Sequence, residues 1–372
     1  MSSTFCVSSH FHVRNPSANS KHVTPLRWTT PRHPILSSKK RLGPLKCKPK
    51  NKVLEDNTIY YRDGDPLTSK IRYFPFVFWK FLRPHTIRGT ILGTASVVIK
   101  VLANNNQPLH WPTLLPCALL GLVALLCGNG YIVGINQLYD IDIDVVNKPY
   151  LPVASGELPR RFASLLCFAL AAIGLSIVSR NFERHILVLY GLGLTLGTAY
   201  SVPPVRLKYN PVAAALIIAA VRGVLLNIGV YFATRAAIGI KGVEWTPGII
   251  FTTVFATTFA LVIAVVKDLP DTEGDSVNGV PTFAVVRGVQ TVARGAILVM
   301  LAYYVGGIAA ALTWSQSLQP MWVAAAHITF AAVLLWRASI MDKGKYTTPE
   351  VKTFYRWIWN LFYAEYLILP FL

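Results

Sequence analysis

The chain has 372 residues, of which 53% are hydrophobic and only 14% are charged, and its formal net charge is +19. Soluble proteins carry roughly 25% charged residues, so this composition excludes a water-soluble globular fold. Five cysteines in a chain of this length also exclude a disulfide scaffold. The sequence therefore predicts an integral membrane protein.

Residues 1–54 differ in composition from the rest of the chain: they hold eleven Lys and Arg residues, no Asp or Glu, and many Ser and Thr residues. A basic, acid-free, hydroxyl-rich segment is typical of an organelle transit peptide. Scattered serines and prolines favour a plastid address over a mitochondrial one, and cleavage is expected near 47–57. The alternative is a disordered basic tail that the mature protein keeps. The other residues carry 36 − 11 = 25 basic and 17 acidic side chains, so the net charge does not indicate nucleic-acid binding.

The remaining sequence contains nine apolar stretches that are long enough, or nearly so, to cross a hydrocarbon layer of about 30 Å. Backbone polar groups in lipid must be hydrogen-bonded within the chain, so helices are the expected form. The sequence predicts an all-α bundle of about nine transmembrane helices over 83–372, with a linker or amphipathic lead-in over 55–82. The predicted spans are 86–103, 113–138, 162–179, 185–201, 212–233, 247–266, 291–314, 321–341 and 354–371.

The loops between these spans differ in charge. Loops on the side of the N-terminus hold twelve Lys and Arg residues, whereas those on the opposite side hold five. Because positive residues accumulate on the cytosolic or stromal face of a membrane, the N-terminal side is predicted to face the stroma. The loops after the second and the sixth span share this side.

Several predicted spans contain pairs of glycines at four-residue spacing. Such pairs usually allow two membrane helices to approach closely. We therefore expect close helix contacts at Gly89/Gly93, Gly130/Gly134 and Gly193/Gly197.

Two clusters of acidic residues lie at ends of predicted spans on the N-terminal side. In the first, four-residue spacing places the side chains on one face if the helix continues; its members are Asn136, Asp140 and Asp144. In the second, Pro270 is expected to interrupt the helix; its members are Asp268, Asp271 and Asp275. Mg²⁺ prefers oxygen ligands and often takes one or two carboxylates together with substrate phosphates. The clusters therefore predict a Mg²⁺ site in one cavity, the alternative being two solvated acidic helix ends.

Basic residues near the same helix ends complete a candidate diphosphate site. They are Arg83, Lys148, Arg206, Lys208 and Lys267, and the alternative for each is membrane anchoring. Arg222 is different because it lies within an apolar stretch, where an ionised side chain is costly. We expect it to contact a substrate carboxylate or diphosphate; the alternative is a structural ion pair with another buried group.

These motifs resemble a known family. Asn136-x-x-x-Asp140-x-x-x-Asp144 and Asp271-x-x-x-Asp275 are similar to the two aspartate-rich motifs of the UbiA superfamily of intramembrane aromatic prenyltransferases. Residues 200–208 resemble the third recurrent segment of that family. Within it, 147–152 and 267–275 are most similar to the plant homogentisate prenyltransferases. Residues 127–136, 221–231 and 359–366 favour the solanesyl-transferring branch, whereas Ala-Ser-Gly-Glu at 154–157 is more like the phytyl branch.

The resemblance implies a nine-helix fold with a central cavity and two Mg²⁺ ions bridged by the substrate diphosphate. The metal ligands implied are Asn136, Asp140, Asp144, Asp268, Asp271 and Asp275. Tyr200 is implied in catalysis, and Tyr139, Tyr200 and Tyr231 could stabilise an allylic cation through their ring faces.

The reaction implied is transfer of a solanesyl group from its diphosphate to homogentisate with loss of CO₂, which gives 2-methyl-6-solanesyl-1,4-benzoquinol for plastoquinone biosynthesis. The alternative within the family is phytyl or geranylgeranyl transfer. From another class, a cation-coupled transporter remains open, although transporters usually have internal repeats and acids near the bilayer midplane. The expected partners are polyprenyl diphosphate, homogentisate and the lipid bilayer, with no nucleic acid and no identified protein partner. The expected location is a plastid membrane, the inner envelope, with the active-site loops in the stroma.

Overall fold

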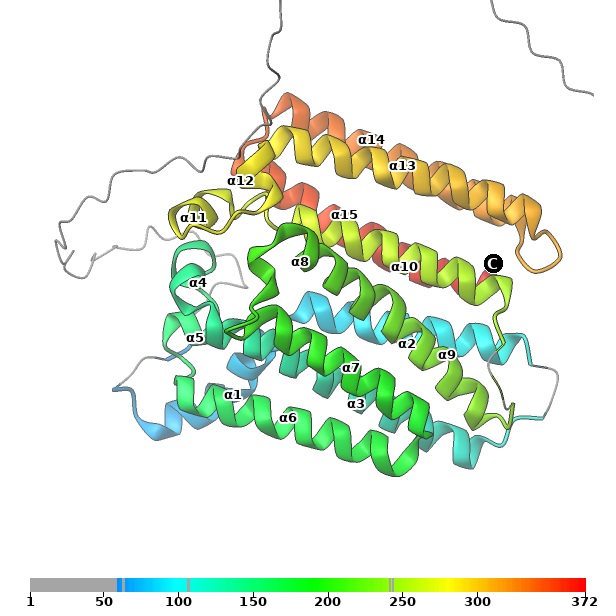
Figure 1. Cartoon of the computed structure of the whole chain (residues 1–372), viewed down its shortest axis with the longest axis horizontal. Helices are drawn as coiled ribbons and strands as arrows, with labels where there is room; N and C mark the ends of the chain where they lie inside the picture. Colours follow the sequence, from blue (N-terminus) through cyan, green and yellow to red (C-terminus); the bar gives the residue numbers. More distant parts are fainter. Residues whose placement is uncertain (1–58, 62–63, 106–107, 241, 243) are drawn as a thin grey trace, which may run out of the picture. The chain divides into compact units, whose positions relative to one another are not determined.

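The computed structural model describes residues 59–61, 64–105, 108–240, 242 and 244–372. The predicted transit segment, 1–54, lies outside these residues. Within them, all regular secondary structure is helical and there is no strand. The all-α prediction is confirmed, and most of the helices run side by side as one bundle (Figure 1).

Each of the nine predicted spans coincides with a long helix or helical run. They are α2 (Pro84–Ala103), α3 (Trp111–Tyr139), α6 (Arg160–Asn181), α7 (Arg184–Ser201), the run from α8 to α9 (Pro211–Ala237), α10 (Pro247–Val266), α13 (Val289–Thr313), α14 (Pro320–Lys343) and α15 (Thr348–Ile368). Within the described ranges, seven of them are long and apolar enough to cross a membrane, and α7 and α15 are not among the seven. The reason is composition: α7 begins with Arg184 and His185, and α15 carries Glu350, Lys352, Arg356 and Glu365. The nine-span count is therefore approximate.

Short helices gather at one end of this bundle. Figure 1 shows α4, α5, α11 and α12 together at that end. Their bounds are α4 Ile141–Asn147, α5 Pro152–Ser155, α11 Thr272–Val277 and α12 Phe283–Arg287. Because α4 follows α3 and α11 follows α10, the two acidic clusters lie at the same end, as the order of the predicted spans indicated.

The run from Pro211 to Ala237 is not a uniform α-helix. α8 (Pro211–Ile218) leads into the π-helical segment η3 (Ala219–Leu225), and α9 (Leu226–Ala237) follows. Gly223 in η3 packs so closely on α10 that a Cβ there would lie 2.4 Å from the Cα of Thr257. Asn227 donates hydrogen bonds to the carbonyls of Arg222 (3.2 Å) and Gly223 (2.8 Å), at the end of this widened turn. This local change of pitch determines where Arg222 lies.

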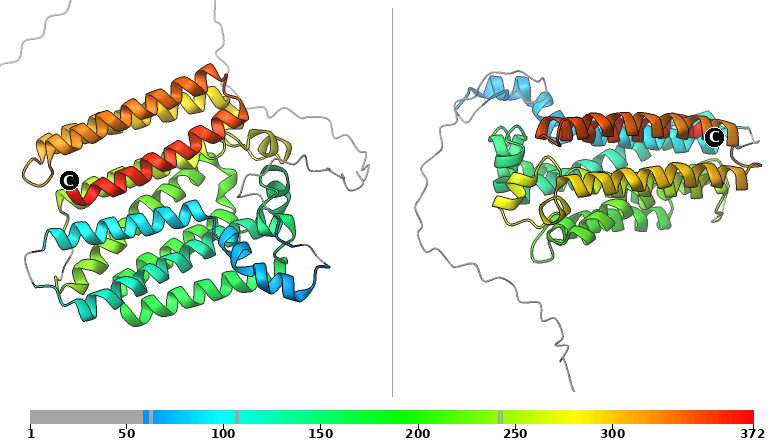
Figure 2. Two further views of the ribbon diagram at one scale, coloured as in Figure 1. Left: turned by 180° about the vertical axis from the view of Figure 1, so that it is seen from behind. Right: turned by 90° about the horizontal axis from the view of Figure 1, so that it is seen from above.

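The segments outside the bundle are α1 and two short 3₁₀ turns. α1 (Leu67–Phe81) precedes α2 and exposes Leu67, Ile71 and Trp79 along one face. Figure 2 shows α1 beside the end of the bundle that holds α4. The turns are η2 (Leu207–Tyr209) and η4 (Leu369–Phe371). η2 lies between α7 and α8 and brings the Arg206–Lys208 segment to the first acidic cluster.

Candidate active site

A cavity of ≈ 1200 Å³ lies inside the helical bundle. All six predicted metal ligands line it, so one volume joins both acidic clusters. The predicted site residues on its wall are Arg83, Asn136, Asp140, Asp144, Lys148, Tyr200, Lys208, Arg222, Lys267, Asp268, Asp271 and Asp275. Arg206 is not part of the wall. The fold therefore brings the other predicted site residues together on the wall of one cavity.

The first cluster lies where α3 passes into α4. The predicted continuous helix is wrong in detail, because α3 ends at Tyr139 and Asp140 has non-helical dihedral angles of φ −116° and ψ 18°. The helical register nevertheless survives, since the amide of Asp144 donates to the carbonyl of Asp140 at 2.7 Å. The Nδ2 of Asn136 donates to the Oδ2 of Asp140 at 2.7 Å. Asp140 and Asp144 are buried, whereas Asp142 is exposed.

The second cluster lies where α10 passes into α11. Lys267 donates to the Oδ1 of Asp268 at 2.7 Å, and the chain then turns through Pro270 to begin α11 at Thr272. Asp271 and Asp275 are buried on the cavity side, and Glu273 is exposed. The interruption expected at Pro270 is confirmed.

Two neighbouring residues, one at the end of α4 and one directly after it, connect the two clusters. Each contacts a residue that lies more than 120 positions further along the sequence. The Nδ2 of Asn147 donates to the Oδ1 of Asp275 at 3.0 Å, and Lys148 forms an ion pair with Asp271. Gly274 makes the first contact possible, because a Cβ at this position would lie 1.9 Å from the Oδ1 of Asn147. Asn147 is a site residue that the sequence interpretation missed. Its only signal was its place beside Lys148 in Asn147-Lys148-Pro149.

Basic side chains neutralise the first cluster. Lys208 forms an ion pair with Asp140, and the Nη2 of Arg83 lies 3.2 Å from the Oδ1 of Asn136 and 3.9 Å from the Oδ2 of Asp144. Arg206 approaches Asp140 from outside the cavity wall: its Nη2 donates to the carbonyl of Tyr139 at 2.8 Å and lies 3.5 Å from the Oδ1 of Asp140. The positive partners that the acidic clusters require are thus supplied by the chain itself.

The two arginines share an uncommon backbone conformation. Arg83 has φ 54° and Arg206 has φ 35°, so both lie in the left-handed region. For a residue other than glycine this conformation costs on the order of 1–3 kcal/mol, and such residues gather at functional sites. The strain places both guanidinium groups beside the first cluster, which supports a functional role for each.

Burial and like charge change the titration of this end of the cavity. Burial raises the pKa of Asp144, against the opposing effect of Arg83. The pKa of Asp275 rises to about 6, chiefly because the carboxyl is buried and also because Asp268 and Asp271 are negative. Burial alone would lower the pKa of Lys148, but Asp271 and Asp144 raise it above its usual value. Lys148 therefore stays protonated in its ion pair with Asp271.

The donor set fits a hard divalent cation bound together with a phosphate ligand. Within the described part of the chain, no three His, Cys, Asp or Glu side chains converge on one point. A closed all-protein metal cage is therefore absent from that part. Mg²⁺, however, usually needs only one or two carboxylates when a substrate phosphate completes its shell. The Oδ2 of Asp144 is buried and accepts no hydrogen bond. A bound Mg²⁺ ion would satisfy this oxygen.

Arg222 lies deeper in the cavity than the acidic clusters. Its Nη2 donates to the carbonyl of Thr86 at 2.9 Å, and its guanidinium carbon lies 5.1 Å from the ring centre of Trp359. The Nε is buried without a hydrogen-bond partner. No carboxylate of the described residues forms an ion pair with Arg222, so the predicted alternative of a structural ion pair is wrong. The ring of His85 stands edge-on to Trp359 at 5.2 Å, and both side chains line the same wall.

The aromatic residues expected at the site are separated by the fold. Tyr200 lies on the cavity wall and interacts with Lys267. Tyr231 lies at the opposite end of the bundle, where its hydroxyl donates to the carbonyl of Glu244 at 3.2 Å, and Tyr139 is not part of the wall. A role for Tyr231 in stabilising a cation at this site is therefore excluded. The ring of Tyr355 and the indole of Trp359 occupy the wall instead.

Comparison with known proteins agrees with this geometry. The family described as the UbiA prenyltransferase family matches residues 91–361. A rice protein named probable homogentisate phytyltransferase 2, chloroplastic, is 50% identical over 305 residues, which cover 82% of this chain and 80% of that protein. Homogentisate solanesyltransferase of Arabidopsis thaliana, also labelled chloroplastic, is 50% identical over 308 residues, which cover 83% of this chain and 79% of that protein.

A solved structure confirms the fold. A UbiA homologue from Archaeoglobus fulgidus, described as bound to GPP and Mg²⁺, superposes with a TM-score of 0.53 at 19% identity and covers 80% of this chain and 100% of its own. The helix arrangement is thus shared, although the sequences have diverged far. The chain therefore belongs to the UbiA prenyltransferase family, and its close relatives are homogentisate prenyltransferases.

Proposed function

We propose that this aromatic prenyltransferase transfers a solanesyl group from its diphosphate to homogentisate, with loss of CO₂, for plastoquinone biosynthesis. The observation that carries the proposal is the composition of the ≈ 1200 Å³ cavity. One end holds acids and cations suited to a metal diphosphate, and the same cavity continues between apolar helices. A donor with a charged head and a long hydrocarbon tail matches both halves.

The polar end favours departure of the diphosphate. The allylic C–O bond breaks, and the diphosphate leaves with the bonding electron pair. Arg83, Lys148, Lys208 and Lys267 all face the cavity, and they can stabilise the charge that develops on the leaving group. Each of these cations already has a carboxylate neighbour, so the wall is ordered before the substrate binds.

The proposed metal ligands are Asp140, Asp144, Asp271 and Asp275, assisted by Asn136 and Asp268. Two Mg²⁺ ions bridged by the diphosphate are proposed, one for each cluster. When bound, Mg²⁺ supplies Lewis-acid polarisation of the diphosphate oxygens. Arg206 acts as a positioning residue in this proposal, because it contacts Asp140 and Tyr139 from outside the wall.

The acceptor is proposed to bind beside Arg222. A guanidinium with a free Nε and no carboxylate partner among the described residues can donate to the carboxylate of homogentisate. The indole of Trp359 lies against Arg222 and forms a flat surface suited to the acceptor ring. The acceptor ring carbon then supplies the electron pair for the new C–C bond and afterwards loses its proton. The side-chain carbon that loses CO₂ takes up a proton and becomes the methyl group of the product. Enclosure between helices keeps water from the allylic cation.

The donor length is proposed from the sequence likeness to the solanesyl branch and from the depth of the cavity. The alternative is a phytyl or geranylgeranyl donor. The rice protein named a phytyltransferase supports it equally, because its identity to this chain is also 50%. The chain is also proposed to reside in the plastid inner envelope with its active-site loops in the stroma, because two relatives are labelled chloroplastic and residues 1–54 are basic and free of acids. A fluorescent fusion of residues 1–70 should enter plastids; cytosolic or mitochondrial fluorescence would contradict this address.

The direct test is a product analysis. Purified protein is incubated with homogentisate, Mg²⁺ and, in parallel, solanesyl, geranylgeranyl or phytyl diphosphate. We expect the largest yield with solanesyl diphosphate, and a product mass that lacks the carboxyl group. A higher yield with phytyl or geranylgeranyl diphosphate would establish the alternative donor. A product that keeps the carboxyl group would refute the decarboxylating reaction.

A further inference from the structure

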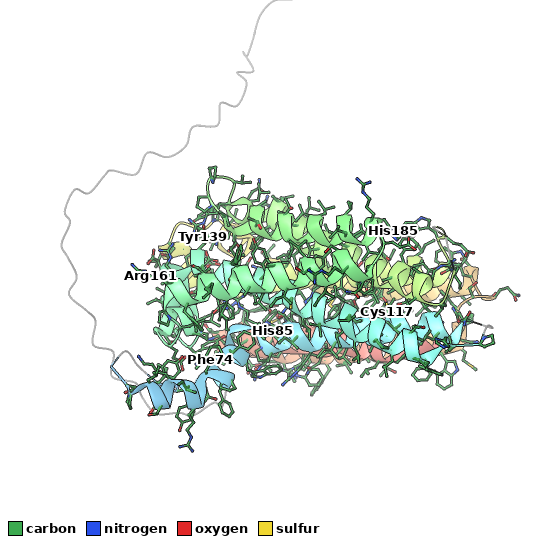
Figure 3. All side chains as sticks on the ribbon, turned by 90° about the horizontal axis from the view of Figure 1, so that it is seen from below. Phe74, His85, Cys117, Tyr139, Arg161 and His185 are labelled. Carbon is green, nitrogen blue, oxygen red and sulfur yellow. The ribbon has the colours of Figure 1, made fainter. Side chains whose placement is uncertain are left out.

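The cavity does not end near Arg222. It continues along α3 as far as Cys117 and Leu114, and along α9 as far as Ala237. The 22 residues of helix between Asn136 and Leu114 correspond to about 33 Å at 1.5 Å per residue. Figure 3 shows Tyr139 near the end that holds the clusters, with Cys117 and His185 nearer the opposite end. A channel with a polar head and an apolar shaft therefore runs along the bundle.

Two glycines on this wall face open space. A Cβ at Gly193 on α7 or at Gly229 on α9 would meet no atom within 4 Å, and both residues line the cavity. Gly197, one turn from Gly193, differs: a Cβ there would lie 2.6 Å from Ile132. The close helix contact predicted for the Gly193/Gly197 pair is therefore correct only for Gly197. Glycine inside a helix costs about 1 kcal/mol relative to alanine, and at Gly193 no close contact explains this cost.

We propose that Gly193 and Gly229 determine the longest prenyl chain that the protein accepts, because they keep the apolar shaft open at two depths. The proposal rests on the proposed function, in that the diphosphate lies at the acidic clusters. The prenyl chain then extends from the clusters along the bundle, first past Gly193 and then past Gly229. A side chain at either glycine closes the shaft at its own depth.

The two depths are well separated. Gly193 precedes Tyr200 by seven residues, which places it about 10 Å below the polar end. Gly229 follows Pro211, at the polar end of α8, by 18 residues, which corresponds to at most about 27 Å, because this run includes the π-helical segment η3. Towards the far end the wall includes small residues such as Ala118, Gly121 and Ala233, together with larger ones such as Leu114 and Leu122. Phe182 narrows this region, since a Cβ at Gly121 would lie 3.2 Å from its ring.

The test uses leucine as a plug at each depth. Gly193→Leu and Gly229→Leu are compared with the wild type, and Gly191→Leu is the matched control. A Cβ at Gly191 also meets no atom within 4 Å, but Gly191 is not part of the cavity wall. Leucine has a higher helix propensity than glycine, so all three variants should fold. Thermal stabilisation by geranyl, geranylgeranyl and solanesyl diphosphates with Mg²⁺ measures binding without turnover, and transfer to homogentisate is measured in parallel.

We expect an order set by depth. Gly193→Leu should bind geranyl diphosphate as tightly as the wild type does, but should bind geranylgeranyl and solanesyl diphosphates at least tenfold more weakly. Gly229→Leu should bind geranyl and geranylgeranyl diphosphates as the wild type does, and should bind only solanesyl diphosphate at least tenfold more weakly. Gly191→Leu should bind all three donors as the wild type does. Unchanged binding of every donor by both plug variants would overturn the proposal, and so would the same losses in Gly191→Leu. If the donors bind in this order but neither the wild type nor any variant prenylates homogentisate, the proposed function is refuted, whereas the role of the two glycines in binding the prenyl chain is supported.

Discussion

Asp275 provides the sharpest test of the electrostatic account, because its carboxylate is buried beside two other acids. Its pKa of about 6, compared with the usual 3.8, means that keeping Asp275 ionised in the folded protein costs about 3 kcal/mol. Asp275→Asn removes this charge but retains an oxygen that can accept the hydrogen bond from Asn147. We expect the variant to be more stable than the wild type at pH 7.5 by up to about 3 kcal/mol, and to have lost turnover.

The pH dependence of the effect follows from the sign of the shift. A carboxyl whose pKa is raised on folding destabilises the folded state above that pKa, and the penalty disappears as the pH falls towards the unfolded value. The stability difference between Asp275→Asn and the wild type should therefore be full above pH 6, shrink between pH 6 and about 4, and vanish below that. Tryptophan fluorescence during thermal unfolding in detergent gives the Tm of each protein across this range.

Glu273→Gln is the matched control, since Glu273 is a carboxylate of the same helix that is exposed to solvent. Its Tm should equal that of the wild type at every pH. The reasoning is refuted if Asp275→Asn has an unchanged or lower Tm at pH 7.5. It is also refuted if the gain is the same at pH 4 and at pH 8, because the gain would then not come from ionisation.

Three further substitutions, one of them with a matched control, test other parts of the site. Asp144→Ala should abolish turnover and Mg²⁺-dependent stabilisation, whereas the exposed Asp142→Ala should leave both near the wild-type level in a membrane-inserted protein. Gly274→Ala should lower kcat/KM at least tenfold, because the added methyl group displaces Asn147 from Asp275 at a cost of about 1–3 kcal/mol; an unchanged kcat/KM would show that this link between the clusters is dispensable. Arg222→Lys keeps the charge but loses the planar fork, so activity should fall at least tenfold, or about 1.4 kcal/mol; unchanged kinetics toward donor and acceptor would exclude Arg222 from substrate binding.

The local features of the protein were predictable from the sequence because each depends on neighbouring residues. Apolar runs of sufficient length predict membrane helices, since lipid offers no partner for backbone polar groups. The interruption at Pro270 follows from the missing amide of proline. The four-residue spacing of Asn136, Asp140 and Asp144 predicted that their side chains share one face, and all three line the cavity.

Tertiary structure decided which of these features meet. Asn147 and Lys148 contact the second acidic cluster from positions more than 120 residues away, a pairing that no local spacing reveals. Arg206 and Tyr231 have residue types suited to the site, yet one lies outside the cavity wall and the other at the far end of the bundle.

The glycines make the same distinction within a single helix. Gly193 and Gly197 are equivalent in the sequence pattern and both border the cavity, but only at Gly197 would a Cβ meet a neighbouring helix, at Ile132. The sequence by itself determined a bundle of membrane helices with two acidic ends on one side, because hydrophobicity and helical spacing are local properties. The cavity, its depth and the pairing of charges along its wall depend on how the helices pack, because each of its surfaces is formed by residues from several helices at once.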